Sequence, residues 1–308
     1  MIQLTKNATY PDGAFYIDAS SLEGRFMKCP KSYFYNQVCK RETSKFPAGR
    51  TFGGIVHDHL LAPYYRGERV NVLAACDALP PEMSDDYRNA GYLCTFWQRY
   101  LDTYSREFEP FEIEKFNDGK LAVELPFAVE IGQLYGNHTT NDIPIVWIGR
   151  MDMVISWPGG TPSPMDHKTS SIGGEGAWDE YANSTQQIGY VWALQKLLEV
   201  PVNEFTINLL LTRKLTANGK GIEFFRQRFS LDQDIVQEFP ERILAVVRHL
   251  FDCDARAYWP MHTSQCKSKF GACEYLDVCK SAPGARLETL ATGMYKDVTW
   301  SPLAKATS

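Results

Sequence analysis

Residues 145–169 read IVWIGRMDMVISWPGGTPSPMDHKT, and this stretch decides the fold. Its first part, residues 145–157, is almost continuously apolar, which predicts a largely buried strand. Gly159 and Gly160 then favour a turn. A short further strand is expected over residues 164–167, so the stretch predicts two strands joined by a turn.

Outward from this stretch, strands and helices are expected to mix. Apolar side chains at every second position from 121 to 129 show the period of a half-buried strand. Ser184-Thr185-Gln186-Gln187 is a capping-box pattern that starts a helix. Strands are also expected over residues 205–211 and 222–229, and helices over residues 20–40, 51–66, 84–108, 184–199 and 232–252. This mixture predicts an α/β fold with a mixed central sheet flanked by helices.

The composition is that of an ordinary globular chain of 308 residues, with 44% hydrophobic and 22% charged residues. It holds no apolar run of about 18 residues, and its start lacks a signal-peptide stretch, so we expect no membrane span and a reducing, cytoplasmic location. The net charge of −5 argues mildly against nucleic acid as a partner. Nucleic-acid binding, however, needs a local basic patch and not a basic total.

Two acids on the predicted strands are candidates for a metal site. In Asp166-His167-Lys168 the acid and the lysine are two apart, so they share one face of a strand. The acid can hold a divalent cation while the ammonium meets a phosphate or positions water; the alternative is a solvated strand end. Asp152 interrupts the apolar run, which is costly unless it is paired or binds metal. Its alternative is an ion pair with Arg150.

Two predicted helices carry further candidates. His57, in Gly53-x-x-x-His57, offers a neutral imidazole as an additional metal ligand, although a lone histidine is more often structural. Gln186 and Tyr190 are four apart, so they share a helix face. Both can hydrogen-bond a phosphate, and the tyrosine can stack on a base. The alternative is an ordinary amphipathic helix with a core tyrosine.

In order and spacing, these motifs resemble the RecB-type branch of the PD-(D/E)XK nuclease superfamily, over about residues 20–280. The resemblance implies metal-dependent hydrolysis of phosphodiester bonds in DNA, with Mg²⁺ or Mn²⁺ as the cofactor. The implied metal ligands are His57, Asp152, Asp166 and the backbone carbonyl of His167. Lys168 would help to activate water, with Gln186 and Tyr190 beside it. Glu124 also falls where such families often place an acid.

The resemblance further implies a restriction-endonuclease-like core within one domain, residues 1–308. The expected regions are a helical N-terminal region (1–115), the nuclease core (116–231), a helix with a cysteine cluster (232–285) and a tail (286–308). Its implied substrate is single-stranded DNA or DNA with free ends, cut by an exonuclease, or alternatively an endonuclease, in recombination, repair or replication. No P-loop is present, so a helicase or recombination partner would be a separate chain.

Two other interpretations compete with a nuclease. The first is an inactive module that keeps the fold and only holds DNA or a partner; the complete acid–acid–lysine set argues against it. The second is a zinc-stabilised protein with no nucleic-acid role, which would require four motif matches by accident.

Three of the eight cysteines cluster as Cys266-x6-Cys273-x5-Cys279. Clustered thiols in a reducing compartment more often bind metal than form disulfides. Sulfur coordination suits zinc or an iron–sulfur cluster, and the missing fourth ligand could be Cys253, His262 or Cys29.

The segment around Cys29-Pro30 resembles the N-terminal end of Cas4-like and AddB-like nucleases. In those families one cysteine before the core and three after it hold a 4Fe-4S cluster. The resemblance therefore implies Cys29, Cys266, Cys273 and Cys279 as cluster ligands. The last three cysteines are more widely spaced here than in the best-known members, which leaves structural zinc as the alternative.

Overall fold

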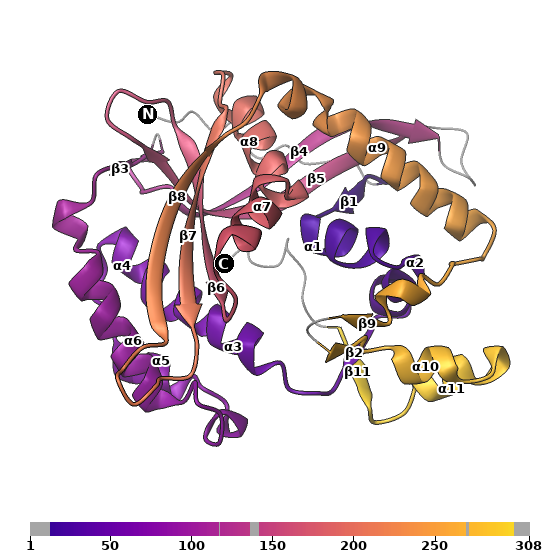
Figure 1. Cartoon of the computed structure of the whole chain (residues 1–308). Helices are drawn as coiled ribbons and strands as arrows, with labels where there is room; N and C mark the ends of the chain where they lie inside the picture. The colour runs from indigo at the N-terminus through magenta and orange to yellow at the C-terminus, as the bar shows by residue number, and fades with distance from the viewer. Residues whose placement is uncertain (1–12, 117, 136–141, 269–270, 299–308) are drawn as a thin grey trace. The chain divides into compact units, whose positions relative to one another are not determined.

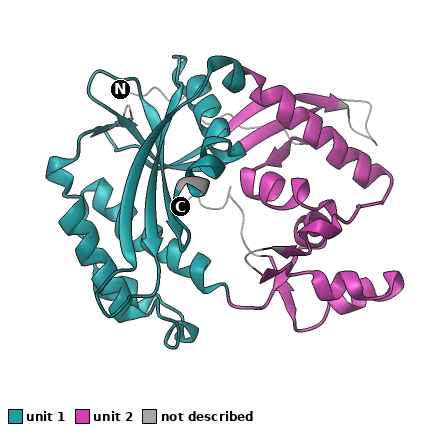
Figure 2. Ribbon diagram, viewed as in Figure 1, with its two compact units in different colours: residues 1–8, 47–127, 150–236 teal, residues 9–46, 128–149, 237–308 magenta. Residues whose placement is uncertain are grey.

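The computed structural model describes residues 13–116, 118–135, 142–268 and 271–298 (Figure 1). Contacts divide the chain into two compact units, each assembled from separate segments (Figure 2). Unit 1 comprises residues 1–8, 47–127 and 150–236, and unit 2 comprises residues 9–46, 128–149 and 237–308. Two of the unit boundaries fall inside strands and one falls inside a helix, so both units share secondary-structure elements.

Unit 1 contains a mixed sheet, which confirms the predicted α/β fold with a mixed central sheet. Its strands are the second half of β5 (Asp142–Ser156), β6 (Ser163–Ser170), β7 (Glu204–Thr212), β8 (Ile222–Ser230) and the short β3 (Glu112–Ile113). β6 pairs antiparallel with β5 but parallel with β7, and β8 pairs antiparallel with β7. A parallel pair needs a long crossover, which α7 (Glu175–Ala182) and α8 (Thr185–Leu198) supply between β6 and β7.

The helices of unit 1 pack an aromatic-rich core against this sheet. One nearly continuous helical stretch consists of α3 (Ala48–Ile55), a π-helical turn (Val56–Leu61) and α4 (Ala62–Arg66). It ends where Gly67 adopts the left-handed conformation, with φ +78°, which glycine tolerates best. α5 (Val72–Asp77) and α6 (Ala90–Thr103) follow. The helix expected over 84–108 is shorter because the Asn89 side chain caps it, accepting a hydrogen bond from the Tyr92 amide.

α8 begins where the sequence predicts, but with a different cap. The Ser184 hydroxyl accepts from the Gln186 amide at 3.2 Å, one residue earlier than in a capping box. The helix ends at Leu198, where Glu199 turns into the left-handed region. Residues around most of its circumference are buried, so α8 is a core helix of unit 1.

Unit 2 joins the early and late segments of the chain. β1 (Phe15–Ile17) pairs in parallel with the first half of β5, and β4 (Val123–Tyr135) also pairs with β5. β2 (Arg41–Thr43) pairs with β11 (Tyr295–Asp297), and β9 (Lys267–Ser268) with β10 (Gly271–Ala272). The helices are α1 (Ala19–Ser21), a π-helical turn (Leu22–Met27), α2 (Pro30–Tyr33), a second π-helical turn (Phe34–Val38), α9 (Gln233–Ala255), α10 (Leu276–Lys280) and α11 (Arg286–Leu290).

The helix expected over residues 20–40 is broken at Cys29. A residue before proline avoids the helical region, and Cys29 is extended, with φ −162° and ψ 107°. Pro30 then occupies the first position of α2, where its missing N–H costs nothing. The Cys-Pro pair therefore sets the cysteine at an interruption between two helical segments. Over the described residues, no helix has both the length and the apolar character needed to cross a membrane.

Candidate active site

Three side chains of unit 1 bring metal-ligating atoms together. His57 lies on the π-helical turn, Glu124 near the start of β4 and Asp152 on β5, and their ligand atoms all lie within 4.8 Å of one another. An imidazole with two carboxylates is a donor set for a divalent cation such as Mg²⁺ or Mn²⁺. Among the residues that the structure describes, this is the one group of three or more such ligands that lies so close together.

Asp152 is buried and held as a carboxylate. Its Oδ2 accepts the His167 backbone N–H at 2.6 Å and lies 3.4 Å from His57 Nδ1. Burial opposes ionisation of Asp152, but the charge and hydrogen bonds of His57 and His167 outweigh it, so the pKa of Asp152 falls well below its usual value. Burial likewise opposes the charged form of His57, and Asp152 overcomes it and raises the pKa of His57.

The ion pair considered between Asp152 and Arg150 does not form. Arg150 Nε lies 2.5 Å from Glu124 Oε2, and its Nη2 lies 3.6 Å from Asp58. The arginine therefore faces the other acids, and Asp152 keeps its carboxylate toward His57 and the backbone of β6.

Glu124 has three features of a ligand that the sequence hardly signals. Its φ is +58°, an unfavourable conformation for a non-glycine residue. The Glu124 Oε2 atom is buried and accepts no hydrogen bond from the described atoms. Arg150 lies close enough to form an ion pair with it, but not in the geometry of a hydrogen bond. Burial, with the charge of Asp152, raises the pKa of Glu124 to about 7. Arg150 already faces this oxygen, so the fit to a metal rests on the meeting of two carboxylates and an imidazole at His57, Glu124 and Asp152.

Metal affinity is expected to depend on pH through Glu124. The pKa of Glu124 is about 7 in the folded protein, against an ordinary value of 4.5. Protonation of Glu124 therefore favours the folded state. This contribution to stability is complete below pH 4.5 and is lost as the pH rises through 7. A metal must displace this proton, so Mn²⁺ affinity should fall by roughly tenfold per pH unit below 7. Calorimetric titration between pH 5.5 and 7.5 measures this slope. Glu124→Gln should release about one proton fewer per metal; an unchanged slope would contradict the assignment.

Asp166 and Lys168 lie together on β6, as the spacing of two predicts. Lys168 Nζ is 2.7 Å from Asp166 Oδ2, which also accepts from Gln187 Nε2 at 3.0 Å. Burial raises the pKa of Asp166 although Lys168 opposes it, and Asp166 in turn raises the pKa of Lys168 against the effect of burial. Asp166 is not one of the three grouped ligands; its carboxylate faces the lysine and α8.

Gln186 and Tyr190 do share one face of α8, but they differ in exposure. The Gln186 amide oxygen accepts from Lys168 Nζ at 2.8 Å, and its Nε2 donates to the Tyr190 hydroxyl at 2.8 Å. Tyr190 is 6% exposed, its ring packs edge-on against Phe127, and its hydroxyl donates to the Arg150 carbonyl at 2.8 Å. This matches the alternative of a core tyrosine. Gln186 contacts Lys168 directly, and the contacts of Gln186 and Tyr190 with nucleic acid stay predictions.

His167 projects its ring into a buried polar network that the sequence did not indicate. Its Nδ1 lies 2.8 Å from Asn208 Nδ2, and its ring stacks on Tyr65 at 5.6 Å between centroids. Burial lowers the pKa of His167 to about 3, so the ring is neutral and Nδ1 accepts this hydrogen bond. Asn208 also donates to the Tyr100 hydroxyl at 3.1 Å. The network fixes the His167 backbone, whose N–H holds Asp152; the carbonyl as a metal ligand stays a prediction.

Gly53 allows α3 to approach β6 one helical turn before His57. A Cβ at Gly53 would lie 2.5 Å from Thr169 Oγ1, whereas a Cβ at Gly54 would meet nothing within 4 Å. Gly53→Ala should therefore destabilise the protein by about 1–3 kcal/mol and weaken Mn²⁺ binding by displacing His57.

Gly54→Ala is the matched control for that change. It should stabilise the protein by about 0.5–1 kcal/mol, because alanine favours a helix over glycine. Thermal unfolding compares the two variants. Equal effects of the same sign would show that the contact with Thr169 does not constrain α3.

Four cysteines of unit 2 line one small cavity. Cys29, Cys266, Cys273 and Cys279 form part of its wall, together with His262. The His262 amide donates to Cys29 Sγ at 3.5 Å, and the Cys273 amide donates to the Cys266 carbonyl at 2.9 Å. Burial raises the pKa values of Cys273 and Cys279, and the neighbouring thiols contribute. Cys253 is buried on α9 and is not part of this wall.

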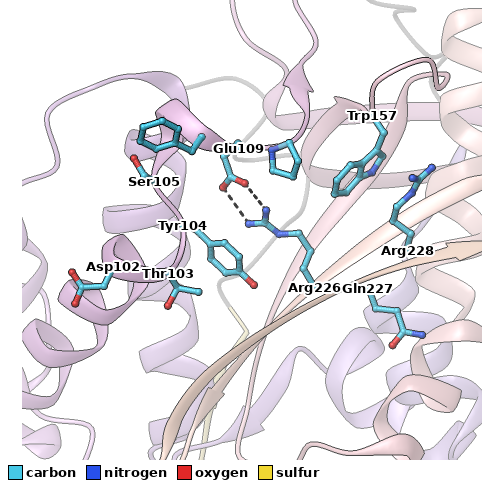
Figure 3. Close-up of a pocket in the computed structure, with 11 residues that line it drawn as sticks. Asp102, Thr103, Tyr104, Ser105, Glu109, Trp157, Arg226, Gln227 and Arg228 are labelled. Atoms are coloured by element: carbon cyan, nitrogen blue, oxygen red, sulfur yellow. Dashed lines mark hydrogen bonds and ion pairs between the residues drawn. The ribbon is translucent and has the colours of Figure 1, made fainter.

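A sizeable cavity of unit 1 is separate from the candidate metal ligands. It measures about 710 Å³, and Tyr104, Trp157, Arg226 and Arg228 contribute to its wall (Figure 3). None of His57, Glu124 and Asp152 lines it. The Glu109 carboxylate in its wall is paired with Arg226, so the candidate active site is the group of His57, Glu124 and Asp152 and not this cavity.

Comparison with known proteins follows this geometry. A family model described as the PD-(D/E)XK nuclease superfamily matches residues 19–280. A provisionally assigned exonuclease from Eubacterium rectale is 14% identical, with 82% of this chain and 88% of that chain covered and a TM-score of 0.46. The crystal structure of SSO0001 is 11% identical, with coverage of 77% and 78% and a TM-score of 0.31. No curated protein sequence matches the chain. Because the family match extends over most of its length, the protein belongs to the PD-(D/E)XK nuclease superfamily.

Proposed function

We propose that this chain is a deoxyribonuclease that uses Mg²⁺ or Mn²⁺ to hydrolyse phosphodiester bonds. The observation that carries the proposal is the meeting of His57, Glu124 and Asp152 in unit 1. Asp166 and Lys168 supply the acid and the ammonium of the family motif on β6. We include Asp166 and the His167 carbonyl among the metal ligands, as the resemblance implies, and add Glu124.

Each residue has a definable task. A divalent cation held by this donor set would withdraw charge from the scissile phosphate and lower the pKa of water. Lys168, 2.7 Å from Asp166, is positioned to orient the attacking water or to neutralise charge on the phosphate. Gln186 accepts from Lys168 and holds its ammonium in place. Tyr190 anchors Gln186 from the core and so acts as a positioning residue.

The substrate that we propose is DNA, single-stranded or with free ends, cut as an exonuclease in recombination, repair or replication. This rests on the RecB-like order of the motifs. A separate helicase or recombination protein would open duplex DNA, since the chain has no P-loop. We place the protein in a reducing, cytoplasmic setting, which would keep its eight cysteines as thiols. None of the eight forms a disulfide in this structure.

A cleavage assay tests this function. Purified protein with Mg²⁺ or Mn²⁺ is incubated with end-labelled linear DNA, closed circular single strands and an RNA of the same sequence. The proposal expects degradation of the linear DNA, with circles and RNA largely spared. Cleavage of circles at a similar rate would make it an endonuclease. Binding without cleavage, under every metal tried, would support the inactive module instead.

We also propose that Cys29, Cys266, Cys273 and Cys279 hold a 4Fe-4S cluster, with structural zinc as the alternative. Their common cavity supports a shared ligand. Four thiolates around one zinc ion, at about 2.3 Å each, would bring their sulfurs to within about 4 Å of one another. A 4Fe-4S cluster also takes four thiolates, so the four cysteines match either group in number.

Cys29→Ser is expected to remove the cluster and loosen unit 2. Wild-type protein purified without oxygen should be brown, and the variant should be colourless and melt several degrees lower, because the ligand ties residue 29 to the segment 266–279. Iron analysis and thermal unfolding measure both effects. Cys253→Ser, outside the cavity wall, is the control and should keep its iron. Wild-type protein with one zinc and no iron would refute the cluster but would agree with four thiolate ligands at these positions.

A further inference from the structure

Two cysteine thiols of unit 1, far from the proposed cluster in sequence, lie against each other on neighbouring helices. Cys76 on α5 and Cys94 on α6 are 18 positions apart, and their Sγ atoms are 3.6 Å apart. Cys94 is exposed and Cys76 is half-buried, its thiol pointing to the Ala90 carbonyl at 3.7 Å. Bonded sulfurs lie about 2.0 Å apart, so only a small side-chain movement separates this pair from a disulfide.

We propose that Cys76 and Cys94 form a reversible oxidation site, at which a low-molecular-weight disulfide such as oxidised glutathione converts them into an intramolecular disulfide. The proposal does not depend on nuclease activity. The Cys76–Cys94 site also differs in chemistry from the proposed cluster site, because it requires two thiols in contact and no metal.

The unequal exposure of the two thiols sets the order of the reaction. The Cys94 thiolate attacks one sulfur of the reagent, forming a mixed disulfide and releasing one reagent thiol. The Cys76 thiolate then attacks the Cys94 sulfur, the mixed disulfide breaks, and the second reagent thiol leaves. The protein loses two protons and two electrons, and both go to the reagent. Burial, helped by the contact with Cys94, raises the pKa of Cys76 to about 11, so Cys76 is a poor first nucleophile, and its attack in the second step depends on its position 3.6 Å from the Cys94 sulfur.

The bond would close the chain around the segment that joins α5 to α6. That segment is already attached to the end of β7, because the Tyr87 hydroxyl donates to the Thr212 carbonyl at 2.8 Å. Cross-linking its two ends restricts the unfolded chain more than the folded one. The oxidised protein should therefore resist heat and proteolysis within this segment better than the reduced protein.

Peptide mapping after oxidation tests the site. Reduced protein is treated with excess oxidised glutathione, remaining thiols are alkylated, and linked peptides are identified by mass spectrometry. Wild type should show Cys76 linked to Cys94, lose two thiols per chain, melt several degrees higher and revert with dithiothreitol. Cys94→Ser should show neither the link nor the shift, and Cys76→Ser should stop at a glutathione adduct on Cys94. Cys253→Ser, a buried thiol elsewhere, should behave as wild type.

Two results would overturn the proposal. One is wild-type protein that keeps glutathione on Cys94 without linking Cys76. The other is a Cys94 disulfide that forms only between chains. Cys76 packs against the core of unit 1, so its replacement could disturb folding. Cys94 is exposed, and the Cys94→Ser arm therefore decides the question by itself.

Discussion

Asp152→Asn should lower the rate of DNA cleavage by roughly 1,000-fold or more, the largest effect expected on activity. Asparagine has nearly the same shape and can still accept the His167 N–H, so the strand pairing of unit 1 should survive. What is lost is the negative charge, which leaves the grouped ligands with one anion fewer. At saturating DNA the loss should appear in kcat, because the carboxylate serves the reacting centre and not substrate binding.

Matched variants separate this role from folding. Lys168→Met and Asp166→Asn should lose activity to a similar degree and should remain folded, as circular dichroism would show. Asp118→Asn removes an exposed acid whose partner is the surface residue Lys120, and it should cleave DNA normally. If Asp152→Asn kept a tenth or more of the wild-type rate with Mg²⁺ or Mn²⁺, the metal assignment would be wrong.

The sequence predicted this site well where periodicity governs geometry. A spacing of two on a strand placed Asp166 and Lys168 on one face, and a spacing of four on a helix placed Gln186 and Tyr190 on one face. The helix and strand types were also correct around residues 121–252, since their apolar periods are clear. These spacings follow from the fixed geometry of strands and helices, so they can be recognised in a single sequence.

The remaining features depend on partners that are remote in sequence. Glu124 is an acid within an apolar alternation, and neither its φ of +58° nor its ion pair with Arg150 can be inferred from the residues around it. Spacing offered an ion pair with Arg150 as the alternative to a metal at Asp152, but Arg150 lies against Glu124 on β4, which pairs with β5. The exposure of Tyr190 was likewise a tertiary property. The division into two units inside strands β4 and β5 has no signature in composition.

Among changes in unit 1, breaking one half of a buried ion pair is expected to have the largest effect on stability. Arg226 on β8 contacts Glu109 with both terminal nitrogens, at 2.5 and 3.2 Å, and the two side chains are 8% and 6% exposed. Figure 3 shows the pair in the wall of the cavity of about 710 Å³. Arg226 also lies 3.9 Å from the centroid of the Tyr104 ring, and the Tyr65 hydroxyl donates to Glu109 at 2.8 Å. The pair thereby supports Tyr65, on which His167 stacks.

Glu109→Gln should destabilise the protein by about 3–5 kcal/mol, because it leaves a buried guanidinium without a counter-charge. Glu204→Gln is the control. It breaks the ion pair between Glu204 on β7 and Arg228, which lies two residues after Arg226 on β8. This pair is partly exposed, so the change should cost less than about 1 kcal/mol. Replacing both partners, as Glu109→Leu with Arg226→Met, should recover much of the loss, since no charge then remains buried. Urea unfolding compares the three variants. A double variant as unstable as Glu109→Gln would mean that the hydrogen bonds to Tyr65, and not charge pairing, are what the fold requires at this position.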